Sequence, residues 1–293
     1  MPDYTTDGLI AQIRRRASMP ESQNLFTDAG LVNMINDEFV AKILPFVVSF
    51  HEEYYLNFID YALDGVTTDY DIPSDAIGNK LKDVQIWREG YMISPLPRLS
   101  PSELSWGIQG YYIKNNKIVL YPNPLATGNT LRIQYYKRPN SLVLNNEGAK
   151  ITQITQSSPN TIFTVQSIPA GITNGSTIDI VEVTSPFKVD ATRTITNIAG
   201  NDITVASVTG ASVGSYICLT GESVSAEIPA ECYVLLAQAV VVRCLEALAD
   251  VGGLQIASSV YESMKADIQN LLTPRVENEP KRIYLPNKLR RYV

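Results

Sequence analysis

The single histidine is the first candidate for a catalytic base or a metal ligand. His51 lies in the run SFHEEYY of residues 49–55, which is not the zinc motif HExxH because position 55 is a tyrosine. No nucleophile motif accompanies His51, so a Ser–His–Asp triad could be suggested only because these three residue types occur in the chain. We therefore interpret His51 as a histidine of a helix surface or an interface.

Two pairs of carboxylates could act in acid–base chemistry or bind calcium. Glu52 and Glu53 are adjacent, whereas Asp69 and Asp71 alternate along a strand-like stretch and therefore share a face. Nothing near them resembles the spaced oxygen ligands of an EF-hand loop. We interpret the aspartate pair as part of a solvated strand edge.

Motifs for nucleotide, zinc or disulfide chemistry are missing. The sequence contains no GxxxxGK[ST] and no GxGxxG pattern, which excludes a P-loop ATPase. Cys218, Cys232 and Cys244 are widely spaced and contain no CxxC pair, so neither a zinc site nor a disulfide framework is expected. The sequence predicts a protein without cofactors or metals that is made in a reducing compartment.

Charge separates the C-terminal segment from the rest of the chain. The net charge is −6, but residues 274–293 carry +4, which leaves −10 on the remainder. Basic and apolar side chains interleave in this segment, and such a mix can anchor an extended arm in a groove or add it to a neighbour's sheet. A solvated disordered tail and direct DNA contact are the alternatives, and Arg14–Arg16 could likewise contact DNA, an acidic neighbour or only solvent. The candidate docking residues of the arm are Arg275, Lys281, Arg282, Ile283, Tyr284, Leu285, Lys288, Leu289, Arg290, Arg291 and Tyr292.

Helical periodicity dominates the N-terminal part. A short helix is expected over Gly8–Arg16, and a longer one should begin where Thr27 or Asp28 can accept from the free amides of its first turn. Pro45 should kink or split the longer helix. Its apolar stripe runs in steps of three and four through Leu31, Ile35, Phe39, Ile43, Phe46, Phe50, Tyr54 and Phe58.

Two β-rich segments follow. Between Val66 and Pro139, alternating residues predict strands and a hairpin that turns at Asn115-Asn116, because asparagine tolerates positive φ. From about Glu147 to Glu222, β-branched runs alternate with Pro, Gly and Asn turns and predict a small inserted β-sandwich or barrel. The expected strands are 68–73, 83–88, 111–114, 117–122 and 130–137 in the first segment, and 161–165, 177–183, 193–198, 203–208 and 216–219 in the second.

The C-terminal part returns to helices. Pro229 suits the first turn of a helix that Gly252-Gly253 should end. A second helix is expected from about Leu254 to Leu272, and Pro274 should stop it. Its predicted apolar stripe is Ile256, Val260, Met264, Ile268 and Leu271.

These elements predict an α+β protein whose body is a helical bundle built from the N- and C-terminal helices. A β-hairpin region, an inserted small β-sandwich or barrel and an extended C-terminal arm complete it. No apolar run approaches the roughly 20 residues of a membrane span, and the N-terminus has no signal-peptide core, so we expect a soluble protein. The expected division is 1–146 for the N-terminal helices and β-hairpin part, 147–222 for the inserted β-domain, 223–273 for the C-terminal helices and 274–293 for the arm.

The order of these elements resembles the head-to-tail adaptor proteins of tailed phages, also called connector or head-completion ring proteins. The resemblance covers about residues 28–139 and 222–293, with 147–222 as an insertion. Its motifs are patterns of packing and turns, so the whole layout carries more weight than any one string. The matching pieces are IPSDAIGNKLKDV at 72–84, the hairpin at 112–122, LRIQYYKRP at 131–139 and the helix entry IPAE at 228–231.

The resemblance implies a non-enzymatic virion protein of the head–tail junction, synthesised in the host cytoplasm. Subunits of that family form a ring, usually twelvefold, beneath the portal, and the C-terminal arm reaches into the portal. Double-stranded DNA passes through the central channel, and an acidic wall would not hold it by counterion release. The implied partners are further copies, the portal protein and downstream neck or tail proteins. The alternatives are a gatekeeper or other tail-proximal ring subunit, a glycan-binding module and a phage hydrolase.

Overall fold

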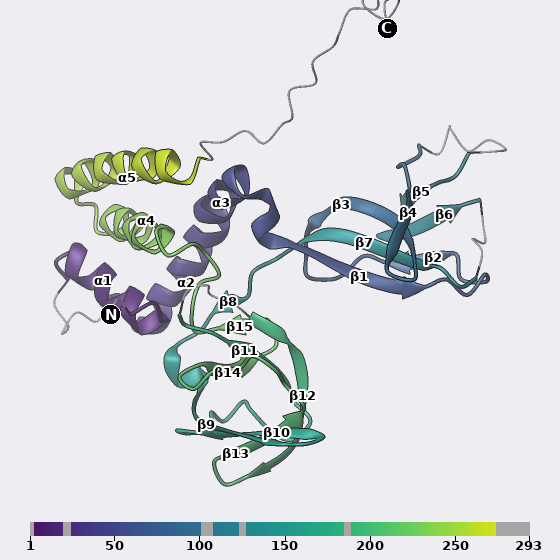
Figure 1. Cartoon of the computed structure of the whole chain (residues 1–293). Coiled ribbons are helices and arrows are strands. Elements are labelled where there is room, and N and C mark those ends of the chain that lie inside the picture. Colours follow the sequence, from purple (N-terminus) through teal and green to yellow (C-terminus); the bar gives the residue numbers. More distant parts are fainter. Residues whose placement is uncertain (1–2, 20–24, 101–107, 123–126, 185–188, 274–293) are drawn as a thin grey trace, which may run out of the picture.

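The computed structural model describes the chain except for residues 1–2, 20–24, 101–107, 123–126, 185–188 and 274–293. It confirms the α+β class, because helices occupy both ends of the described chain and strands form most of the elements between them. A sheet region and a barrel extend away from the helices in different directions (Figure 1). Each of these three parts has its own cluster of buried apolar side chains.

Within the described residues, the helical part contains five α-helices: α1 (Thr6–Arg16), α2 (Asp28–Glu38), α3 (Leu44–Phe50), α4 (Cys232–Ala247) and α5 (Val251–Leu272). Thr27 caps α2 as predicted, because its hydroxyl accepts from the amide of Gly30. Pro45 splits the long N-terminal helix, and the π-helical turn η1 (Phe39–Ile43) separates α2 from α3. A proline lacks an amide hydrogen and crowds the preceding turn, so the hydrogen-bond ladder changes there.

The prediction that this helix continues to Phe58 is wrong. The helix ends at Phe50, the 3₁₀ turn η2 follows over Glu52–Tyr55, and strand β1 begins at Leu56. Phe50, Tyr54 and Phe58 are four residues apart, a step that lies on one face of a helix and also on one face of a strand. The apolar stripe therefore could not show where the helix stops.

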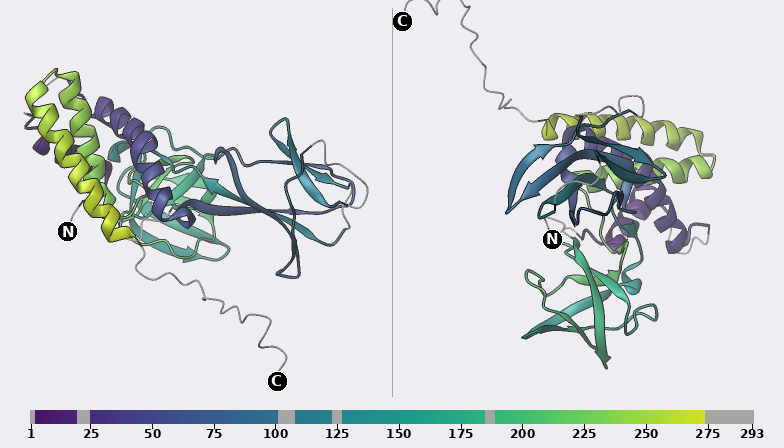
Figure 2. Two further views of the ribbon diagram at one scale, coloured as in Figure 1. Left: turned by 90° about the horizontal axis from the view of Figure 1, so that it is seen from above. Right: turned by 90° about the vertical axis from the view of Figure 1, so that its right-hand side faces the viewer.

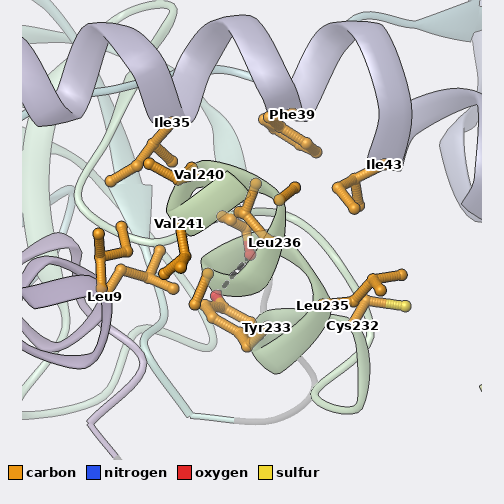
Figure 3. Close-up of a cluster of buried hydrophobic side chains, with 14 of the residues drawn as sticks. Leu9, Ile35, Phe39, Ile43, Cys232, Tyr233, Leu235, Leu236, Val240 and Val241 are labelled. Carbon is orange, nitrogen blue, oxygen red and sulfur yellow. Dashed lines mark hydrogen bonds between the residues drawn. The ribbon is translucent and has the colours of Figure 1, made fainter. Parts of the chain in front are cut away.

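The first helix of the C-terminal part, α4, is the centre of the helical part. α1, α2, η1 and α5 pack against it. Figure 3 shows Leu236 and Val240 of α4 turned toward Ile35 and Phe39 of the α2–η1 run. No helix in the described part of the chain is long and apolar enough to cross a membrane.

The prediction that Gly252-Gly253 ends the first C-terminal helix, α4, is wrong. α4 ends at Ala247, and the chain turns at Ala249, whose φ is 55°. Asp250 then caps α5 by accepting from the amide of Gly253, so Gly252 and Gly253 both lie in the first turn of α5. The capping aspartate sets the helix start, and the glycines follow it.

The sheet region consists of two antiparallel sheets whose buried residues form one cluster. Its strands are β1 (Leu56–Ala62), β2 (Asp69–Asp71), β3 (Ala76–Arg88), β4 (Tyr91–Pro95), β5 (Gly110–Lys114), β6 (Lys117–Tyr121) and β7 (Thr130–Lys137). The order is β1-β7-β3-β4 in one sheet and β2-β6-β5 in the other. Asn115 and Asn116 form the β5–β6 turn with φ of 49° and 62°, as predicted. β1 and β4 were not expected.

The inserted segment contains a closed barrel with the strand order β10-β13-β12-β11-β14-β9. Its strands are β9 (Ala149–Ser157), β10 (Asn160–Val165), β11 (Thr177–Val181), β12 (Val189–Ala199), β13 (Asp202–Ala206) and β14 (Tyr216–Leu219). Five strands were predicted, and β9 was missed. The pairing of β9 with β10 shifts register between Thr164 and Val165, opposite Gln153 and Ile151, so the apolar alternation of β9 is interrupted.

Two short strands carry the chain into and out of the barrel. β8 (Ser141–Leu142) and β15 (Glu222–Ser223) pair in parallel. Immediately after β15, the carbonyl of Val224 accepts from the amide of Thr6 at 2.7 Å. The start of α1 is therefore tied to the strand that returns from the barrel.

Candidate docking surfaces

The predicted docking arm lies outside the described residues. All eleven candidate side chains fall within 274–293. The described chain ends at Thr273, directly after α5. In the sequence, therefore, the arm follows α5, which is labelled in Figure 1.

His51 and Glu52 belong to the connection between the helices and the sheets. The carbonyl of His51, at the end of α3, accepts from the amide of Tyr54 at 3.0 Å. The exposed Glu52 carboxylate accepts from the hydroxyl of Tyr136 and, at 2.9 Å, from Nζ of Lys82. The hydrogen bond from Tyr136, and then that from Lys82, lower the pKa of Glu52. This carboxylate links η2 to β7 and β3.

The aspartate pair lies on an exposed strand edge. Asp69 and Asp71 are both exposed on β2, and Asp71 forms an ion pair with Lys117 of β6 at 3.1 Å. Over the described ranges, no group of three or more His, Cys, Asp and Glu side chains could hold a metal ion.

The sequence analysis overlooked one nucleophile-like motif. Residues 210–214, GASVG, fit the pattern GxSxG. They lie between β13 and β14, whereas the nucleophile elbow requires a strand followed by a helix. The Ser212 hydroxyl is 3.0 Å from a carboxylate oxygen of Glu182 and 3.0 Å from the hydroxyl of Ser215. The chain's one histidine, His51, belongs to the helical part, so Ser212 has no histidine beside it to complete a Ser–His–Asp triad.

The three arginines of α1 divide into two that connect helices and one that is free on the surface. Arg14 pairs with Asp28 at 2.6 Å and so links α1 to the start of α2. Arg16 donates to the side-chain oxygen of Gln238 in α4 at 2.9 Å. Arg15 is exposed. Two of the three positions therefore have a structural explanation.

Helical part, sheet region and barrel meet at Asn140, which is 6% exposed. Its side-chain amide donates to the Asp179 carboxylate of β11 at 2.8 Å and to the carbonyl of Glu222 at 3.1 Å. Its backbone amide donates to the carboxylate of Glu227 at 3.3 Å. The carbonyl of Glu227 accepts from the hydroxyl of Tyr55 at 2.7 Å. These bonds fix how the three parts are joined.

The outer face of the first sheet carries an aromatic and cationic cluster. The guanidinium of Arg132 lies 4.1 Å from the ring centre of Phe58 and 4.0 Å from that of Trp87. It also donates twice to Asp60, at 2.8 and 2.7 Å. Phe58 and Met92, which pairs in register with Trp87, are both more than half exposed. Aromatic, Met and Arg side chains are enriched at protein interfaces, so this face is a candidate docking surface.

α5 presents a second candidate surface, and its predicted stripe is divided by the structure. Met264 and Ile268 pack against the helical core, whereas Ile256, Val260 and Leu271 are exposed. A groove of about 650 Å³ separates α5 from η1 and α3, and one of about 410 Å³ separates it from the end of α1. The helix is therefore flanked by open grooves on two sides.

Comparison with known proteins gives one informative match. Residues 4–169, more than half of the chain, match the SU10 adaptor protein family. No curated protein matches the chain. The crystal structure of group B streptococcus pilus 2b backbone protein is similar over 56% of this chain and 78% of that chain, with 14% identity and a TM-score of 0.19. That score is too low to indicate a shared fold.

Proposed function

The chain belongs to the SU10 adaptor protein family, whose members are phage adaptor-type structural proteins, and from this premise we propose that it is a head-to-tail adaptor of a tailed phage. In this proposal, copies of the chain form a ring beneath the portal, twelvefold as is usual in the family it resembles. The ring joins capsid to tail and lets double-stranded DNA pass through its centre during packaging and ejection. The role is structural and not enzymatic.

The observation that carries the proposal is the continuous span of the family match. Residues 4–169 include α1 to α3, the whole sheet region and the first two strands of the barrel. The match therefore does not rest on one small motif. We further propose that the helices form the bundled wall of the ring, and that the sheet region and the barrel project toward neck or tail proteins.

The junction at Asn140 supports a connecting role. A connector has to keep its contact surfaces in a fixed relation, and buried hydrogen bonds to charged groups are among the stronger ones in proteins. Asn140 and Asp179 are nearly fully buried, and together they join the barrel to the strands that lead back to α4. Such a junction would hold the projecting parts in place on the helical wall.

The charge distribution supports DNA passage. Residues 1–55 and 223–273, which contain the helices, carry 14 acidic and 6 basic side chains, a net charge of −8. A wall rich in lysine and arginine would bind phosphates and release counterions, which would hold DNA in the channel. An acidic wall would let it slide.

Deletion of residues 274–293 tests the predicted portal-docking arm. We expect the truncated chain to fold and to form rings, but to lose stable binding to the purified portal protein. The measurement is negative-stain imaging of the intact and truncated chains, each with and without the portal. Undiminished binding of the truncated chain would exclude the arm as the docking element.

Two arm variants separate charge from apolar contact. Replacing Arg290 and Arg291 by serine should weaken portal binding and reduce its dependence on salt, because exposed charge contacts are screened. Replacing Tyr284 and Leu285 by serine should weaken binding and leave its salt dependence unchanged. If the intact chain forms no ring with or without the portal, the adaptor proposal is wrong.

A further inference from the structure

The outer face of α5, formed by Gly252, Ile256, Ser259 and Val260, exposes two apolar side chains and no charged one. α5 has 22 residues, about 33 Å of helix, but only Ala257 and Tyr261 are buried. Ile256, which is 69% exposed, and Val260, which is 40% exposed, lie on this face, whereas Val251, which is 76% exposed, lies on a different side of the first turn. Most helices in proteins are stabilised by packing of an apolar face, and this face is left unpacked within one chain.

Charge indicates what kind of partner could cover this face. Residues 251–261 contain no charged side chain, although the helix-bearing segments carry a net charge of −8. Two copies of such a protein repel wherever their acidic surfaces come within the Debye length of about 8 Å. A face without charges is where two like-charged copies can approach, whereas a basic partner would find no counter-charge there. These properties favour a second copy of the chain.

The opposite side of the helical part offers a matching surface. Ala29, Asn33 and Val40 lie on one face of the α2–η1 run and are exposed, Val40 at 56%. α4 packs against both α2 and α5, and it lies between them in the views of Figures 1 and 2. Faces on opposite sides of a subunit make head-to-tail contacts, which close into rings when the rotation allows it.

We propose that the outer face of α5 in one copy packs against the outer face of α2 and η1 in the next copy. This inference rests on the proposed ring and names the contact that builds it. The small side chains of Gly252 and Ser259 beside Ile256 allow the two helices to approach closely. The contact brings Ile256 and Val260 against Ala29 and Val40, with the uncharged Ser259 and Asn33 at its centre and the exposed Asp37 four residues from Asn33 on α2.

Site-directed cross-linking tests the pairing. Ser259 and Asn33 are exposed at the centres of the two faces, whereas Cys218, Cys232 and Cys244 are fully buried and should not react. A mixture of S259C and N33C chains, treated with a short bismaleimide, should give a covalent dimer, and the double variant should give a ladder up to the full ring. Each single variant alone should remain uncoupled.

The outcomes separate the pairing from the ring itself. If rings form and S259C does not link to N33C, the pairing is wrong and the ring stands. If S259C links to itself, the contact is two-fold and not head-to-tail. If the intact chain forms no ring, alone or with the portal, the adaptor proposal fails together with this inference.

Charge substitutions give a second test that does not depend on cross-linking. The I256E/V260E variant should lose rings, and the V66E/V213E control should keep them, because Val66 and Val213 are exposed in the sheet region and the barrel. Both variants should melt like the original chain under conditions in which all are monomeric. Rings that survive I256E/V260E would overturn the proposal. S259W, which adds bulk on the same face, should also lose rings and serves if the double variant folds poorly.

Discussion

In the barrel, six strands close on themselves and leave no free sheet edge, and their inward side chains form a complete core. In the helical part, α4 is enclosed by its neighbours, but α5 turns Val251, Ile256 and Val260 to solvent. The barrel therefore completes its own packing within one chain. The helical part leaves apolar surface uncovered, which is consistent with the proposal that this part contacts other copies of the chain.

The two parts also differ in how their elements are distributed along the chain. The barrel strands are contiguous between Ala149 and Leu219, whereas the helices come from both ends of the sequence. A contiguous unit with its own core can fold by itself, while a discontinuous unit needs both segments to meet. The comparison thus predicts that the barrel is dispensable for folding of the helical part.

Removing the barrel gives the largest test of this comparison. Residues 147–222 can be replaced by a short Gly–Ser linker, because β8 and β15 lie side by side and Leu142 pairs with Ser223. We expect the shortened chain to keep its helical circular dichroism and to unfold in one cooperative transition. Loss of cooperative melting would show that the division at 147 and 222 is wrong.

Cavities placed in the two cores should act separately. Phe163 in the barrel and Leu236 in α4 are both 0% exposed. We expect F163A to destabilise the barrel by about 3–5 kcal/mol and L236A to destabilise the helical part by about 2–5 kcal/mol. Urea unfolding followed by circular dichroism at helical and strand wavelengths should show each variant shifting one transition. If both transitions move together in either variant, the two cores form one cooperative unit.

A smaller effect is expected where the parts meet. N140A removes the donor to Asp179, a carboxylate that is 4% exposed, and should cost about 1–3 kcal/mol. The loss should appear mainly as a looser barrel, measured as greater spread in small-angle X-ray scattering of the monomer. N57A removes the bond from its side-chain amide to the hydroxyl of Tyr135, which lies within the sheet region, and is the matched control. Equal scattering of the two variants would contradict a role of Asn140 in holding the barrel.

Local signals in the sequence predicted much of the fold. Thr27, Pro45 and the Asn115-Asn116 turn act through their own chemistry, so their structural roles could be inferred without knowledge of distant residues. The strand at Thr130–Lys137 was predicted with its correct bounds, because its alternation is regular. Capping residues, prolines and regular alternation are local properties of a chain.

Features set by distant contacts could not be predicted. Phe58 fits a helix and a strand face equally well, and its strand is fixed by pairing with β7. β9 was missed because its bulge disrupts the alternation, and its place follows from barrel closure. The stripe on α5 was recognised, but only the packing of α4 decides that Met264 turns inward and Ile256 outward.

The Asn140 junction likewise could not be predicted from the sequence, because its partners Asp179 and Glu222 are far from Asn140 along the chain. The proposed contact faces could be identified only once the arrangement of α2, α4 and α5 in space was known. For the portal-docking arm, the prediction still rests on composition alone.

The smallest predicted effect concerns Glu227, whose carboxylate accepts from the backbone amide of Asn140. Burial raises the pKa of Glu227 above its ordinary value of 4.5, and this outweighs the opposing effects of Lys137 and of that hydrogen bond. An acid with a raised folded-state pKa stabilises the fold fully below its unfolded pKa and loses that contribution as pH rises through the folded value.

E227Q stays neutral and keeps the acceptor, so it should melt at a higher temperature than the original chain at about pH 8. The difference should shrink toward about pH 4. E53Q, at an exposed position, should show no such trend. A melting difference that is independent of pH would mean that the junction does not place this carboxylate away from water.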